Sequence, residues 1–134
     1  MKMDEVEGIG PVYAEQLALA GIATADALLE QGAKPGGRAA IEKATGISQA
    51  LILKWVNRID LMRIIGVGSE FSDLLEMAGV DSPAELANRN AANLANTFQE
   101  AVAARPGTVR RIPSETEVAG WIASAKVMPK VVEH

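Results

Sequence analysis

Two pairs of basic residues are spaced so that they could bind an anion together. Lys54 and Arg58 are four residues apart, so in a helix they share a face. Arg110 and Arg111 are adjacent and stand just before a predicted helix start at Ser114. Because a helix N-terminus and two guanidinium groups attract the same negative charge, this second pair could hold a phosphate. The alternative interpretation is a solvated face whose basic residues pair with the acidic segments of the other half of the chain.

The charge of the chain is unevenly distributed, which bears on both interpretations. Residues 36–63 carry a net charge of +3 and residues 101–134 a net charge of +2, whereas residues 1–35 carry −4 and residues 64–100 carry −5. The whole chain has a net charge of −4. This is the wrong sign for a protein that is held on nucleic acid mainly by its overall field. Any contact with phosphates must therefore come from local basic patches.

Residues that could support catalysis or bind a metal ion are scarce. The chain has no cysteine, and its only histidine is His134. The acidic residues Asp4, Glu5 and Glu7 are better explained by a frayed N-terminal segment than by a pair of acid–base carboxylates. The sequence therefore predicts a protein that is not an enzyme and that has no metal, no cofactor and no small-molecule substrate.

Length and composition limit the fold. The chain of 134 residues is long enough for a single domain, or for two half-size units that share one core. Hydrophobic residues make up 49% of the chain and aromatic residues only 4%, and this alanine-rich composition favours an all-α fold. The N-terminal residues do not resemble a signal peptide, and no apolar run reaches the roughly 20 residues of a membrane helix. We therefore expect a cytoplasmic protein that makes no membrane contact.

The sequence contains an internal repeat. The stretch EGIGPVYAEQLALAGI (residues 7–22) returns as IGVGSEFSDLLEMAGV (residues 65–80), so that glycines and apolar residues match at an offset of 58 residues. Trp55 and Trp121 match at an offset of 66, so the second copy has gained 8 residues, which we place within residues 104–113. Matching glycines and apolar residues at this many positions with one offset are not expected by chance. The matched tryptophans are typical of core or interface anchors.

Start and stop signals predict four short helices in each repeat, about eight in all. Pro11 opens the first helix, and Gly21 ends it in a left-handed conformation. A turn is expected over residues 34–37 (KPGG), and a long helix over residues 48–62. The predicted N-cap residues of three other helices are Thr24, Ser82 and Ser114. The expected units are residues 6–62 and 63–128, followed by a frayed tail over residues 129–134.

The order of these elements resembles a known family. GIGPVYAEQL, GIATADALL, TGIS, LKWVNRIDLMRI and GVG, in this order, are similar to the uncharacterised bacterial and archaeal family called domain of unknown function 4332, over roughly residues 6–128. The glycine pairs resemble the helix-hairpin-helix motif. The resemblance implies an all-α fold of two pseudo-symmetric helix-hairpin-helix units around one shared core. It implies almost nothing about activity.

The resemblance also implies a role for the glycine pairs. In DNA-binding helix-hairpin-helix proteins, two glycines let the backbone approach a phosphate, and the amides that open the next helix point at it. Between the glycines, an apolar side chain is tucked into the core. We also expect Gly10→Val or Gly68→Val to unfold the hairpin locally. Carried onto this chain, the nucleic-acid-binding residues are Gly8, Ile9, Gly10, Gly66, Val67 and Gly68.

The sequence departs from this family pattern directly after the second glycine. DNA-binding hairpins usually have Lys or Arg there, whereas this chain has Pro11-Val12 and Ser69-Glu70. The Glu70 carboxylate would repel a phosphate. An equally simple interpretation is that the hairpins only turn the chain between packed helices.

We therefore expect a non-catalytic binding module. The first hypothesis is sequence-independent binding of nucleic-acid phosphates by the hairpin amides together with Lys54, Arg58, Arg110 and Arg111. The alternative is a protein-interaction adaptor, in which the repeats present helix faces to a protein partner and the hairpins are structural. The acidic net charge and Glu70 favour this alternative.

Overall fold

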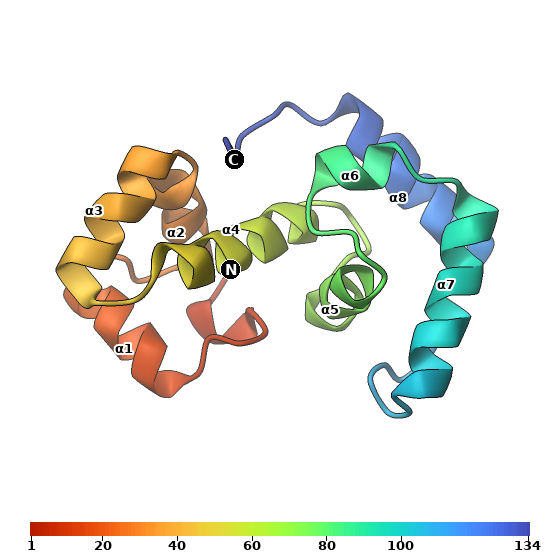
Figure 1. The fold of residues 1–134 in the computed structure, drawn as a ribbon, viewed down its shortest axis with the longest axis horizontal. Coiled ribbons are helices and arrows are strands. Elements are labelled where there is room, and N and C mark those ends of the chain that lie inside the picture. The colour runs from red at the N-terminus through yellow and green to blue at the C-terminus, as the bar shows by residue number, and fades with distance from the viewer. The chain divides into compact units, whose positions relative to one another are not determined.

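The structure is a computed structural model that describes residues 1–134. It contains eight α-helices, one short 3-10 helix and no strand, which confirms the all-α prediction (Figure 1). The chain divides into two compact units. Unit 1 is formed by residues 1–60 and 130–134, and unit 2 by residues 61–129. The buried apolar side chains form one cluster within each unit, where the sequence suggested a single shared core.

Each unit is built from a similar series of elements. The first series is η1 (Met3–Glu5), α1 (Pro11–Leu19), α2 (Ala25–Gly32), α3 (Pro35–Thr45) and α4 (Gln49–Met62), whose last two residues belong to unit 2. The second series is α5 (Ser69–Met77), α6 (Pro83–Ala87), α7 (Ala91–Ala104) and α8 (Glu115–Val127). The predicted number of helices and the long helix near residues 48–62 are therefore confirmed. None of these helices is both long and apolar enough to cross a membrane.

The helix ends follow local sequence chemistry. Pro11 occupies the first position of α1, where its missing N–H is not needed. Gly21 follows with φ +86°, and the amide of Ile22 donates to the carbonyl of Leu17 at 2.9 Å. At the start of α8, the Ser114 hydroxyl and the Glu117 carboxylate each accept the other residue's backbone N–H, as in a capping box.

The predicted turn at residues 34–37 is wrong in extent. Helix α3 already begins at Pro35, so Gly36 and Gly37 lie inside its first turn. The reason is packing, since a Cβ at Gly37 would collide with the backbone carbonyl of Gln31. A Cβ at Gly32 would likewise lie only 2.7 Å from a methyl group of Val56. Gly37 therefore lets α3 approach α2 closely, and Gly32 lets α4 approach α2 closely.

A tryptophan packs against the first glycine of each glycine turn. We call residues 8–10 the first glycine turn and residues 66–68 the second glycine turn. Gly8 has φ +91° and Gly66 has φ +95°. A Cβ at Gly8 would lie 3.5 Å from Nε1 of Trp55, and one at Gly66 would lie 3.1 Å from Nε1 of Trp121. The backbone therefore passes close to an indole ring in both units, at a conformation that favours glycine.

The rings that contact these tryptophans are also repeated. Tyr13 lies 5.1 Å from Trp55 between ring centroids, and Phe71 lies 5.3 Å from Trp121. Both tryptophans are buried. Their interpretation as core anchors is therefore confirmed, and the offsets found in the sequence correspond to equivalent contacts in the two units.

The structure contradicts the expectation that valine at Gly10 or Gly68 would unfold the turn. Gly10 and Gly68 have φ of −82° and −98°, which other residues adopt readily. A Cβ at either position would meet nothing within 4 Å. Valine at Gly10 or Gly68 is therefore not expected to unfold the turn, because these residues only cap α1 and α5.

The predicted frayed tail is also wrong. Residues 130–134 belong to unit 1, where Val132 is 2% exposed within the apolar cluster. The amide of Glu133 donates to the carbonyl of Ala33 at 2.7 Å. An apolar side chain and a backbone bond are sufficient to order this short segment.

We predict that Gly66→Ala lowers the free energy of unfolding by about 1–2 kcal/mol, because alanine is strained at positive φ. The close approach of Trp121 adds to this effect. Urea denaturation followed by tryptophan fluorescence measures the change. Gly120→Ala is the matched control, because this helical glycine has open space around it and alanine should stabilise α8 by about 0.5–1 kcal/mol. Equal stability of Gly66→Ala and the wild type would contradict the role assigned to the glycine–tryptophan contact.

Candidate nucleic-acid interface

The middle amides of the two glycine turns are already occupied. The amide of Ile9 donates to the carbonyl of Val6 at 3.1 Å, and the amide of Val67 donates to the carbonyl of Ile64 at 3.0 Å. These bonds close the turns. Both side chains are buried as expected, but the predicted role of Ile9 and Val67 as phosphate donors is wrong, because their N–H groups are used within the chain.

The amides that open α5 have no acceptor within the chain. The first bond of this helix runs from the amide of Ser72 to the carbonyl of Gly68, and the N-cap Gly68 has no side chain with which to cap it. The N–H groups from Gly68 to Phe71 are therefore available to a ligand. Helix α1 also begins at a glycine, but Pro11 removes one of its donors. The helix that follows the second glycine turn thus offers more free N–H groups than the helix that follows the first.

Arg110 and Arg111, in the loop before α8, contact the first turn of α5. The Nε atom of Arg110 is 3.4 Å from a carboxylate oxygen of Glu70, and the Arg110 side chain is 91% exposed. The guanidinium carbon of Arg111 lies 5.4 Å from the centre of the Phe71 ring, a cation–π contact. The structure therefore brings Arg110 and Arg111 to the first turn of α5, which follows the second glycine turn, although 40 residues separate Arg110 from Glu70 in the sequence.

Arg111 is bound by a second carboxylate. Its two terminal nitrogens donate to the two carboxylate oxygens of Glu117 at 2.6 and 3.0 Å. The hydrogen bond from Arg111, aided by the backbone N–H of Ser114, lowers the pKa of Glu117 to about 2. The same pair raises the pKa of Arg111. Both arginines thus pair with acidic residues of their own unit, whereas the sequence suggested pairing between the two halves.

Arg58 does not lie on a binding surface. Its side chain is only 7% exposed, and its Nη1 atom donates to the carbonyl of Glu7 at 3.1 Å. The predicted contact of Arg58 with phosphate is therefore wrong, because the buried guanidinium group is hydrogen-bonded to the backbone carbonyl of the residue before Gly8. Lys54 is exposed on the same helix. The two residues share a helix but not an accessible face.

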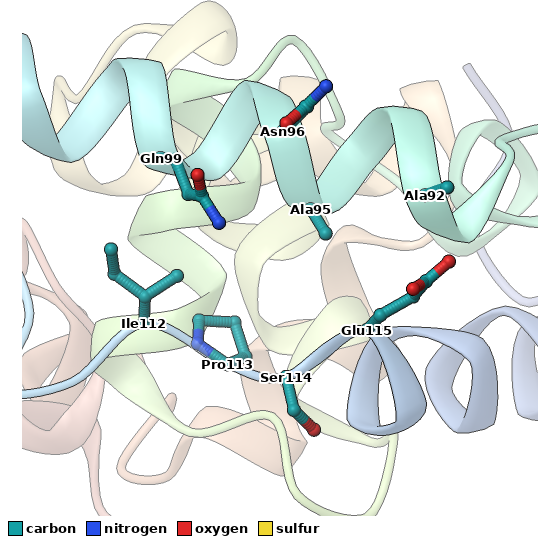
Figure 2. Close-up of a pocket in the computed structure, with 8 residues that line it drawn as sticks. All are labelled: Ala92, Ala95, Asn96, Gln99, Ile112, Pro113, Ser114 and Glu115. Atoms are coloured by element: carbon teal, nitrogen blue, oxygen red, sulfur yellow. The ribbon is translucent and has the colours of Figure 1, made fainter.

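The sequence did not predict a groove that lies beside the loop between α7 and α8. It has a volume of about 510 Å³ and lies between α7 and the segment that enters α8. In Figure 2, Ala95 and the amide of Gln99 point towards Pro113, whereas the hydroxyl of Ser114 points away. Its lining residues are Ala92, Ala95, Asn96, Gln99, Ile112, Pro113, Ser114 and Glu115. These lining residues form no recognisable sequence motif. The only sequence signal near the groove was the 8-residue insertion, which showed that the two repeats differ in this region.

The structure contains no group of three or more His, Asp or Glu side chains that could hold a metal ion.

We predict that the ion pair between Arg111 and Glu117 makes stability depend on acidic pH. Because the pKa of Glu117 is lowered from 4.5 to about 2 in the folded protein, its contribution is complete above pH 4.5 and is lost as the pH falls towards 2. Glu117→Gln keeps the capping geometry without the charge, so the variant should be less stable than the wild type at pH 7 and equally stable at pH 2.

Thermal unfolding at pH values from 7 to 2 measures this difference. Glu100→Gln removes an exposed charge from α7 and is the control, since its effect should not follow the same curve. A constant difference between Glu117→Gln and the wild type across the whole range would show that the ion pair has no part in stability.

Comparison with known proteins identifies a family. The family model described as a domain of unknown function (DUF4332) matches residues 7–128, which is most of the chain. No curated protein and no solved structure shows significant similarity to the chain. The chain therefore belongs to the DUF4332 family.

Proposed function

We propose that this DUF4332 protein is a non-catalytic module that binds the phosphate backbone of nucleic acid without reading its sequence. The second glycine turn, the first turn of α5, and Arg110 and Arg111 make up the binding surface. The observation that carries the proposal is the position of Arg110, whose side chain is 91% exposed beside the open amides of α5. A cation and a helix N-terminus at one place form an anion site.

The second glycine turn has several features of the helix-hairpin-helix motif. It joins two α-helices, its first glycine has a positive φ, its middle side chain is buried, and its last glycine leaves the next helix uncapped. The first glycine turn follows only the short 3-10 helix η1. The proposed phosphate-binding site therefore lies in unit 2.

Glu70 limits the strength of the proposed site. In the free protein its carboxylate is paired with Arg110, which reduces its repulsion of a phosphate. When a phosphate binds, the two negative groups compete for the same guanidinium group. Because Arg111 is also shared with Glu117, we expect weak binding that falls as salt concentration rises.

A protein-interaction adaptor is the second candidate function. The observation that favours it is the exposed apolar surface of α1, where Val12 is 68% and Leu19 is 82% exposed. At the equivalent positions of α5 the chain has Glu70 and Met77, so the two repeats have diverged on this face. An unpartnered apolar helix face is a common feature of surfaces that bind proteins.

We predict that the purified protein binds short single- and double-stranded DNA and RNA in fluorescence anisotropy measurements at low salt. Affinity should be micromolar or weaker and should fall as salt is raised, because phosphate contacts release counterions. No binding to any of these probes at low salt would reject the proposal and favour the adaptor.

We predict that single charge changes near α5 alter this binding in opposite directions. Arg110→Ala should weaken it and reduce the slope of log affinity against log salt by about one. Glu70→Gln should strengthen it several-fold, because it removes the competing carboxylate. Lys43→Ala is the matched control, since it removes an equal charge from an exposed position on α3. Equal losses in Arg110→Ala and Lys43→Ala would mean that binding depends only on overall charge.

A further inference from the structure

A buried arginine in unit 1 binds the backbone at the end of α2. The Arg38 side chain is 4% exposed, and its Nη1 atom donates to the carbonyls of Gly32 and Ala33 at 2.8 and 3.1 Å. These carbonyls belong to the last turn of a helix and have no partner within it. The guanidinium group therefore caps α2 and is held in a fixed orientation.

The second terminal nitrogen of Arg38 binds the C-terminal segment. Its Nη2 atom donates to the carbonyl of Glu133 at 2.7 Å, while the amide of Glu133 donates to the carbonyl of Ala33 at 2.7 Å. The residue just before, Val132, is 2% exposed within the apolar cluster of unit 1. The site thus recognises both polar groups of one peptide unit and one apolar side chain.

This site is largely formed by residues other than the segment that occupies it. Two of the three Arg38 hydrogen bonds lead to α2, so the guanidinium group is oriented without help from Glu133. Gly37 lets α3 pack closely on α2 and so brings Arg38 to the end of that helix. A binding group that is held in place before its ligand arrives loses little entropy when the ligand binds.

Few contacts hold the segment on its own chain. Residues 129–132 make no backbone hydrogen bond, and Pro129 has no N–H to donate. The polar contacts of the segment are those to Ala33 and Arg38, and its buried side chain is Val132. It can therefore leave the site by breaking few interactions.

We propose that the Arg38 site is a peptide-binding site that accepts residues 130–134 of a second copy of the chain, so that two copies exchange these segments. An identical segment brings the same valine and the same peptide unit, so every contact of the closed form is reproduced between copies. The proposed exchange involves unit 1 and does not depend on nucleic-acid binding.

The first experiment uses a fluorescein-labelled peptide of residues 128–134 and the protein of residues 1–134. Val132→Asp places a charge in the apolar cluster, so the variant's own segment should leave the site vacant. The peptide should bind this variant at least about tenfold more tightly than the wild type, because the wild-type site is occupied by its own segment and the apparent affinity falls with the vacant fraction.

Two controls separate site binding from a general effect of charge. Val131→Asp carries the same change at the neighbouring, half-buried position and should bind the peptide as weakly as the wild type. A peptide that carries Val132→Asp should bind none of the proteins. If Val132→Asp fails to fold by circular dichroism, Val132→Ala replaces it with the same expected order of affinities. No binding of the wild-type peptide to a folded Val132 variant would overturn the proposal.

The second experiment tests the exchange between copies. Light scattering after size-exclusion chromatography should show a wild-type dimer fraction that rises with protein concentration. The dimer should be absent from Val132→Asp, and an excess of the free peptide should dissociate it in the wild type. A wild type that stays monomeric up to about millimolar concentration, where weak complexes are populated, would overturn the exchange.

Discussion

The contact between an indole ring and the first glycine of a turn is the constraint on which each unit depends. Trp55 packs against Gly8 and Trp121 against Gly66, and a Cβ at Gly66 would crowd the Trp121 ring, whereas one at Gly8 would reach ordinary contact distance. Positive φ at the glycine then directs the chain into the next helix, α1 or α5. The ring is held in turn by an aromatic residue of that helix. One large side chain thus sets both the turn and the first helix of a small core that has few other aromatic residues.

Starting from this common frame, the two units have acquired different surfaces. Unit 2 has a longer loop whose arginines contact Glu70 and Phe71 in the first turn of α5. Unit 1 uses its arginines inside the protein, where Arg38 and Arg58 bind backbone carbonyls. A guanidinium group can serve either purpose, because its planar fork binds carbonyls, carboxylates and phosphates alike. Burial decides which of these partners it meets.

Most elements of the fold were predictable because their signals are local. Pro11, Gly21, Thr24 and Ser114 start or end helices through contacts within a few residues, and these predictions were confirmed. Gly37 misled the prediction, since a glycine in a loop and a glycine at a contact between helices look the same in a sequence. The tail was misjudged for a related reason, because Val132 finds its apolar partners among residues that are distant in sequence.

The sequence by itself determined the helical class, the repeat and the helix ends, because periodicity and capping depend on neighbours a few residues away. Tertiary structure alone decided which basic residues meet solvent. Lys54 and Arg58 have the spacing of a binding pair, yet Arg58 is buried against the carbonyl of Glu7. Arg110 reaches Glu70 only through the path of a loop. The charge and spacing of residues follow directly from the sequence. Whether a charged side chain is buried, and which group it pairs with, depends on contacts between residues that are distant in sequence.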